Sequence, residues 1–387
     1  MRKLAIYILS IYVFLLPLDS ILVMSGEETG ATYTRLLSIA TIIIVYLYVT
    51  ANKLPLPKMQ TMFITTIFIV YGLLSYFWAT DPELLKDRIF IFLNMLLFYL
   101  AASVLPVNKR DYQTLVTALK SGSSLAVLYL LKIYFIDGVT FAGDRASMIY
   151  ENRETDPNQF AFSLLLPLAL TLDATITSIE LRSKMIYTGS LVLIATGIVV
   201  TGSRGGMLGM LTILSVYLLS SLSARRIVII LSVIASLTYV FEEIVKNRFE
   251  VALATGGAGR LDIWEVGIMA FIHKPILGYG LSNFPAAYDM YRYINSLQGA
   301  SRAAHSIFLS ALVELGLIGV LIVTVMLISH YKTISKINDD YSLPLKAAFC
   351  GMLVQSLTLD VWWRKSFWIL LIFINIAYFM SQRTENE

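Results

Sequence analysis

The sequence predicts an all-α integral membrane protein with about twelve transmembrane helices. Hydrophobic residues make up 57% of its 387 residues and charged residues only 14%, which is too apolar for the surface of a soluble domain of this length. Apolar runs long enough to cross a hydrocarbon layer of about 30 Å also recur from one end of the chain to the other. We therefore expect a single membrane domain over residues 1–387.

Each apolar run approaches the roughly 20 residues that a helix needs to cross the bilayer. The predicted spans are residues 4–24, 33–51, 60–79, 88–105, 112–136, 160–176, 185–200, 206–221, 227–242, 305–330, 343–360 and 366–381. The first run lacks a small-x-small cleavage site and further spans follow it, so we expect an uncleaved helix rather than a secretory signal.

The basic residues predict the orientation of the bundle, because Lys and Arg in short loops resist translocation. If the chain starts in the cytoplasm, every inward loop is basic. These loops contain Arg2 and Lys3, Lys53 and Lys58, Lys109 and Arg110, Arg182 and Lys184, Arg225 and Arg226, and Lys332 and Lys336. The first outward loop, SGEETGATYT, has no Lys or Arg, and the other outward loops mix both signs. We expect both termini in the cytoplasm.

Two outward loops are long enough to carry a function of their own, residues 137–159 and the large loop 243–304. Within the large loop, residues 261–273 have an amphipathic helical pattern and could lie on the bilayer surface as a lid. Its predicted apolar face consists of Leu261, Trp264, Ile268 and Phe271. The charge pattern does not indicate nucleic acid, and the single Cys350 cannot form an intramolecular disulfide.

Arginines next to glycines are candidates for anion binding on the outward side. Arg204 lies in the short connection TGSRGG, and Arg260 follows TGGAG. Glycine lets backbone N–H groups approach an anion, and a guanidinium matches phosphate oxygens bidentately. Further outward positive charge comes from Arg145, Arg153, Arg292 and Arg302. These side chains could hold a diphosphate, or they could contact lipid headgroups and end helices.

His305 begins an apolar segment that contains Glu314. A histidine accepts a proton near neutral pH, and nearby cations would keep it neutral. His305 is thus a candidate general base, although a structural role is the alternative. Glu314 lies nine residues further on, so on one straight helix the two side chains would point to opposite faces. We expect Glu314 to support the site through an arginine or a backbone donor.

The sequence contains none of the common motifs for metal, nucleotide or serine-nucleophile chemistry. It lacks Asp-x-Asp, His-Glu-x-x-His, a cysteine cluster, a Walker loop and a Gly-x-Ser-x-Gly elbow. We therefore expect neither a dedicated metal site nor another cofactor. An arginine-held phosphate and a lone base at a membrane-facing entrance remain.

Four motifs follow one another around the large loop: TGSRGGMLGM, GRLDIW, PILGYGLSNF and AHSIFLSALVELGLIG, and DPNQFA precedes the sixth span. In this order they resemble the signature of the O-antigen ligase and Wzy polymerase superfamily, over roughly residues 140–325. Ser306 stands where many members have Asn. The resemblance implies a helical, GT-C-like enzyme of the bacterial inner membrane with its site at the periplasmic face.

The resemblance further implies metal-independent, inverting glycosyl transfer from a glycan on undecaprenyl diphosphate. Arg204 and Arg260 would bind the diphosphate, and His305 would be the catalytic base for the acceptor hydroxyl. Residues expected to contact substrate or support the site are Arg145, Asn158, Tyr279, Arg302 and Glu314. The aromatic residues of the large loop could stack on sugars or anchor it at the interface; they are Tyr279, Phe284, Tyr288, Tyr291 and Tyr293.

The acceptor stays open. A ligase transfers the glycan to lipid A-core, a polymerase transfers it to a second lipid-linked glycan, and a third group modifies proteins. The 387 residues include no appended soluble domain of the sort frequent in that third group, and we expect a ligase with the polymerase as the alternative. A lipid-glycan transporter is the alternative from another class, but transporters usually have internal repeats and midplane sites.

Overall fold

The structure is a computed structural model. It describes residues 1–19, 21–22, 32–54, 59–141, 145–150, 153–221, 223–240, 242, 246, 250, 259–295, 302–337 and 339–384. Parts of both predicted outward loops, including 243–245, 247–249, 251–258 and 296–301, lie outside these residues. The large loop as a unit therefore stays a prediction.

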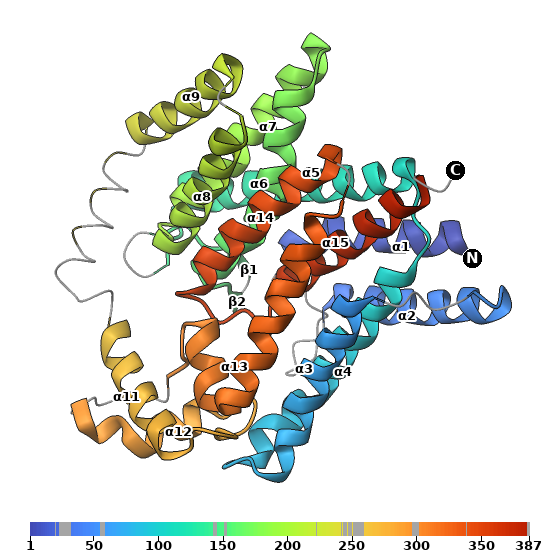
Figure 1. The fold of residues 1–387 in the computed structure, drawn as a ribbon. Coiled ribbons are helices and arrows are strands. Elements are labelled where there is room, and N and C mark those ends of the chain that lie inside the picture. The colour runs from blue at the N-terminus through green and yellow to red at the C-terminus, as the bar shows by residue number, and fades with distance from the viewer. Residues whose placement is uncertain are drawn as a thin grey trace.

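The described chain is helical except for one short hairpin, in which β1 pairs antiparallel with β2 (Figure 1). Its elements are α1 Arg2–Leu15, η1 Leu16–Leu18, α2 Tyr33–Ala51, α3 Gln60–Leu74, η2 Ser75–Phe77, α4 Pro82–Val104, α5 Lys109–Leu131, η3 Lys132–Ile136, β1 Ile149–Tyr150, β2 Arg153–Glu154, α6 Pro157–Thr177, α7 Leu181–Val200, α8 Arg204–Ser220, α9 Ala224–Val240, α11 Arg260–His273, α12 Phe284–Tyr291, η4 Arg292–Asn295, α13 Ile307–Ile334, α14 Asp339–Ser356 and α15 Lys365–Thr384.

Among the described residues, each predicted apolar range overlaps a helix, and the all-α class is confirmed. Within the described residues, 8 helices are long and apolar enough to cross a membrane, namely α2, α3 with η2, α4, α5 with η3, α6, α7, α13 and α15. The chain is thus a multi-pass membrane protein. α8 is apolar but has 17 residues, and α14 contains Asp339, Asp340 and Lys346. The full count of about twelve spans stays a prediction.

Short polar side chains begin the helices that surround the site. Asp81, Asp156 and Ser203 each accept a backbone N–H at the start of α4, α6 and α8. Ser306 does the same for α13. Such caps satisfy N–H groups that have no partner inside the helix. In the predicted orientation, all four of these helices begin on the outward side.

α13 is broken, whereas one straight helix was expected through residues 305–330. Gly316 has φ 64° and ψ −163°, which interrupts the helix. His305 precedes the helix and has a left-handed backbone with φ 49°. The expectation that His305 and Glu314 occupy opposite faces of one helix is therefore wrong, because the chain is not helical at His305.

The predicted helix 261–273 is confirmed as α11, and a face other than the predicted apolar one packs on the protein. α11 buries Ile263, Val266, Gly267 and Ala270, while Leu261 and Ile268 are 61% and 51% exposed. A Cβ on Gly267 would lie 3.0 Å from Leu309 Cδ2, so small residues allow α11 to approach α13 closely. α11 and α12 lie together beside one end of α13 (Figure 1).

Gly316→Ala should destabilise the protein, because an alanine is strained at positive φ and its Cβ would lie 2.2 Å from the Ile276 carbonyl oxygen. Such backbone strain costs about 1–3 kcal/mol before the clash is added. Thermal unfolding in detergent measures the loss. The control is Gly189→Ala in α7, where a Cβ meets nothing within 4 Å and should stabilise the helix slightly. Equal melting temperatures for the two variants would contradict the break at Gly316.

Candidate active site

The site is built around the segment 275–283, which lies against the break in α13. The amide of Tyr279 donates to the Val313 carbonyl (3.0 Å), Gly280 donates to Glu314 (2.7 Å), and Leu317 donates to Pro275 (2.9 Å). The segment thus satisfies carbonyl and amide groups that the break leaves unpaired. A Cβ on Gly278 would lie 2.5 Å from the Glu314 backbone, which explains the glycine in PILGYG.

The same segment is held on its other side by the turn that joins α3 and α4. The Thr80 amide donates to the Tyr279 carbonyl (2.9 Å), the Leu281 amide donates to Ser75 Oγ (2.8 Å), and the Asp81 amide donates to Asn283 Oδ1 (2.7 Å). The segment is therefore fixed between two parts of the chain that are far apart in sequence.

Glu314 anchors the start of α12. Its side chain is buried, and its carboxylate accepts the Ser282 amide (2.9 Å) and the Phe284 amide (3.2 Å). Phe284 is the first residue of α12, and a carboxylate interacts favourably with the positive N-terminal end of the helix dipole. A glutamate inside an apolar helix is thus explained by backbone donors that it satisfies.

His305 lies half-buried directly before α13 and forms no hydrogen bond with another described residue. Burial lowers the pKa of His305 below its ordinary value of 6.5, and the positive charge of Arg260 lowers it further. Arg302 and Arg364 also lower this pKa, while Asp156 opposes them. The imidazole is therefore neutral at neutral pH and able to accept a proton.

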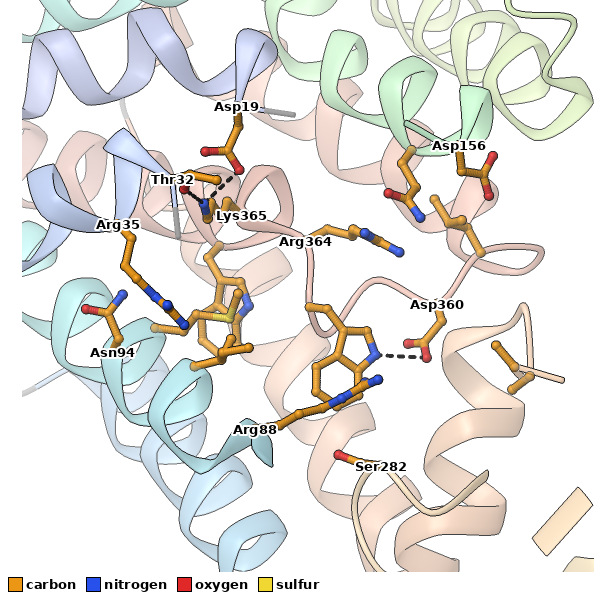
Figure 2. Close-up of a pocket in the computed structure, with 18 of the residues that line it drawn as sticks. Asp19, Thr32, Arg35, Arg88, Asn94, Asp156, Ser282, Asp360, Arg364 and Lys365 are labelled. Atoms are coloured by element: carbon orange, nitrogen blue, oxygen red, sulfur yellow. Dashed lines mark hydrogen bonds and ion pairs between the residues drawn. The ribbon is translucent and has the colours of Figure 1, made fainter. Parts of the chain in front are cut away.

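His305 and Glu314 line one cavity of about 600 Å³, to which α1, α2, α4, α6, α12, α13 and α15 contribute. Figure 2 shows part of its wall, including Arg35, Arg88 and Arg364. The other charged residues that line it are Asp19, Arg35, Arg88, Asp156, Asp360, Arg364 and Lys365. In the predicted orientation all of them lie at the outward ends of their spans. Ser282, Phe284 and Trp363 complete part of the wall.

Three buried polar atoms in the wall of this cavity have no hydrogen-bond partner among the described residues: Asp360 Oδ1, Arg364 Nε and Ser282 Oγ. The other oxygen of Asp360 accepts from Trp363 Nε1 (3.1 Å) and Ser310 Oγ (3.3 Å). Burial raises the pKa of Asp360. Because an unpaired buried polar atom costs about 1–3 kcal/mol, these atoms indicate where a polar ligand binds.

Arg204 and Arg260 line a second, smaller pocket of about 230 Å³. Leu208, Leu261 and Trp264 also line it, and the buried Trp264 Nε1 has no hydrogen-bond partner in the part of the chain that the structure describes. Thr358 lines this pocket while the next residues, Leu359 and Asp360, line the large cavity. The two spaces therefore lie on either side of residues 358–360, and the charge of Arg260 reaches His305.

The glycines near Arg204 serve helix packing. A Cβ on Gly205 would lie 2.8 Å from Thr358 Oγ1, and a Cβ on Gly206 would lie 2.7 Å from Ala161 Cβ. The Gly206 amide already donates to Ser203 Oγ (3.1 Å). That amide is therefore not available to an anion, contrary to the expected role of this glycine, and the guanidinium groups carry the positive charge of the small pocket.

Arg145 and Asn158 come together but do not line either space. Arg145 donates to the Thr201 carbonyl (2.9 Å) and to Asn158 Oδ1 (3.0 Å). The Asn158 carbonyl accepts from Gln355 Nε2 (2.8 Å). These contacts connect loop 137–159 to the turn before Arg204 and to α14, so the geometry favours support over substrate contact for both residues.

Tyr279 is enclosed rather than exposed to a substrate. It is 1% exposed, its hydroxyl donates to the Tyr291 hydroxyl (3.0 Å), and Lys274 Nζ lies 4.5 Å from its ring. Of the aromatic residues considered in the large loop, Phe284 lines the cavity. Arg302 is exposed and lies next to cavity-lining Ala303.

Sequence reasoning missed Arg35, Arg88, Asp360 and Arg364. The available signal was their position, because each lies at the outward end of a predicted span, as in KDRIF and DVWWRKS. Distance along the chain hid it, since spans far from His305 in sequence bring these side chains to the same cavity.

Residues 189–324 match a family model, Wzy_C, described as O-antigen ligase. The matched segment contains Arg204, Arg260, His305 and Glu314, and the match confirms the resemblance to the O-antigen ligase and Wzy superfamily. It indicates glycan transfer of the ligase or polymerase type, with lipid-linked glycans as substrates. No curated protein matches the chain.

The His305 pKa should lie below 6.5 and rise in Arg260→Gln, because removing the positive charge stabilises the imidazolium. NMR titration of histidine-labelled protein in nanodiscs measures it among the 3 histidines. Arg182→Gln, an exposed arginine at the opposite end of α7 from Thr201, should leave this pKa unchanged. A His305 pKa above 6.5, or one that does not respond to Arg260→Gln, would refute the electrostatic coupling.

Proposed function

We propose that this chain, which carries the O-antigen ligase signature over residues 189–324, transfers a glycan from undecaprenyl diphosphate to an acceptor hydroxyl at the periplasmic face of the bacterial inner membrane. The observation that carries the proposal is the pair of adjoining spaces, one with Arg204 and Arg260 and the other with a neutral, half-buried His305.

The small pocket fits the diphosphate. Arg204, Arg260 and the unpartnered Trp264 Nε1 offer only donors there. Leu208 and Leu261, which are 46% and 61% exposed, continue from this pocket to the lipid-facing surface and suit the polyprenyl chain. The first sugar then lies toward the large cavity and His305.

The reaction needs a base and a stabilised leaving group. The acceptor oxygen attacks the anomeric carbon from the face opposite the diphosphate, His305 takes the hydroxyl proton, and the bond from the anomeric carbon to the diphosphate oxygen breaks. Arg204 and Arg260 stabilise the negative charge that the diphosphate gains. The anomeric centre is inverted. The two guanidinium groups neutralise the charge of the diphosphate, as a metal ion does in other transferases.

A ligase that uses lipid A-core is the first candidate, and a polymerase that uses a second lipid-linked glycan is the alternative. The wall of the large cavity offers both cationic and neutral polar groups, which suit the polar groups of either acceptor.

Purified protein should transfer glycan from a polyprenyl diphosphate donor to lipid A-core, read by gel and mass spectrometry. His305→Ala should lower kcat by about 10²–10⁴, and Arg204→Ala and Arg260→Ala by about 10²–10³. The rate should fall as pH drops through the His305 pKa, below 6.5, because protonation removes the base. Lys132→Ala, an exposed cation paired with Asp137, should keep full activity.

The products separate the alternatives. Longer lipid-linked chains formed without lipid A-core would identify a polymerase. Full activity in His305→Ala would contradict the role of the base. Absence of any transfer, together with glycan movement across vesicle membranes, would support a transporter instead.

A further inference from the structure

The large cavity has two further arginines that the proposed donor site does not use. Arg35 from α2 and Arg88 from α4 line it, and Figure 2 shows Arg35 and Asn94 on the opposite side of Arg364 from Asp156. Neither arginine lines the small pocket with Arg204 and Arg260. Both lie outside the segment 189–324 that matches the ligase family.

Both guanidinium groups are placed against aromatic rings. Arg88 Cζ lies 4.1 Å from the Trp363 ring centroid, and Arg35 Cζ lies 5.1 Å from that of Phe90. Across the described residues, neither arginine forms a salt bridge. Stacking fixes the plane of a guanidinium while leaving its N–H groups directed outward.

Among the described residues, the carboxylates of the cavity form no salt bridge with these arginines and have other hydrogen-bond partners. Lys365 Nζ bonds Asp19 (2.7 Å) and Thr32 (2.9 Å). Asp156 caps α6, Glu314 accepts two amides of the α12 start, and Asp360 accepts from Trp363 and Ser310. Arg35 and Arg88 therefore keep N–H groups for a ligand, as does Arg364 through its unpaired Nε.

Glycosyl transfer brings two substrates to one cavity, and the diphosphate of the donor is assigned to Arg204 and Arg260. We propose that Arg35 and Arg88 bind an anionic group of the acceptor, a phosphate on a membrane-anchored glycolipid, and so direct its hydroxyl to His305. This inference rests on the proposed function. The phosphate could belong to the acceptor glycan itself or to the diphosphate of a second lipid-linked glycan, because the same guanidinium chemistry binds both.

The test separates acceptor from donor kinetics. With saturating donor and varied phosphorylated lipid A-core, Arg35→Gln and Arg88→Gln should each raise the acceptor KM by about 10- to 100-fold, as expected for a lost charge-assisted contact. The donor KM should change less than twofold. Arg35→Lys keeps the positive charge and should recover part of the acceptor affinity. If Arg88→Gln fails to fold, the two Arg35 variants still test the site.

Two controls make the assignment specific. Lys86→Gln removes a cation of α4 that pairs with Glu83 outside the cavity and should leave both KM values unchanged. Phosphatase-treated lipid A-core should show a raised KM with the wild type and no further rise with Arg35→Gln. A polyprenyl diphosphate glycan tested as acceptor shows whether its diphosphate is bound by the same two arginines.

Direct binding of labelled, phosphorylated lipid A-core and of labelled polyprenyl diphosphate glycan distinguishes failure of this inference from failure of the proposed function. If either glycolipid binds the wild type more tightly than Arg35→Gln but no transfer occurs, the anion site is supported and the proposed transferase activity is contradicted. Equal binding of both to the wild type and to Arg35→Gln would overturn the acceptor site. A raised donor KM in Arg35→Gln with an unchanged acceptor KM would overturn it too.

Discussion

The break of α13 at Gly316 is the constraint on which the site depends. It exposes backbone groups that pair with the segment 275–283, and it places the buried Glu314 where its carboxylate accepts two amides at the start of α12. Ser282 and Phe284 thereby enter the cavity wall next to His305. Irregular backbone within a membrane protein is tolerated where it is buried in protein, as it is at Gly316.

The carboxylates and the arginines of the site have different roles. The carboxylates of the cavity hold the structure together through caps, the ion pair of Asp19 with Lys365, and bonds to backbone amides. Arg204 and Arg260 line the small pocket, and Arg35 and Arg88 line the large cavity. Burial and the charge of Arg260 keep His305 neutral. In the proposed account the protein binds anions at two places and uses His305 as the base.

The helices and much of the site could be predicted from the sequence, because apolar length and local motifs report on nearby structure. The starts of α6 and α8 and the placement of Arg204, Arg260 and His305 near one face follow from such signals. The relation of His305 to Glu314 could not be predicted, since a positive φ at His305 depends on contacts distant in sequence. The side of α11 that packs on the protein could not be predicted, because it includes the small residues Gly267 and Ala270. Arg35 and Arg88 reach the cavity only through tertiary packing.

A structure of the protein in nanodiscs with undecaprenyl diphosphate bound, determined by electron cryomicroscopy, tests the central claim most directly. We expect density for the diphosphate between Arg204 and Arg260, with one oxygen close to Trp264 Nε1 and the prenyl chain leaving past Leu208 and Leu261. Diphosphate density at Arg35 and Arg88, with none in the small pocket, would contradict both the donor site and the assignment of Arg35 and Arg88 to the acceptor.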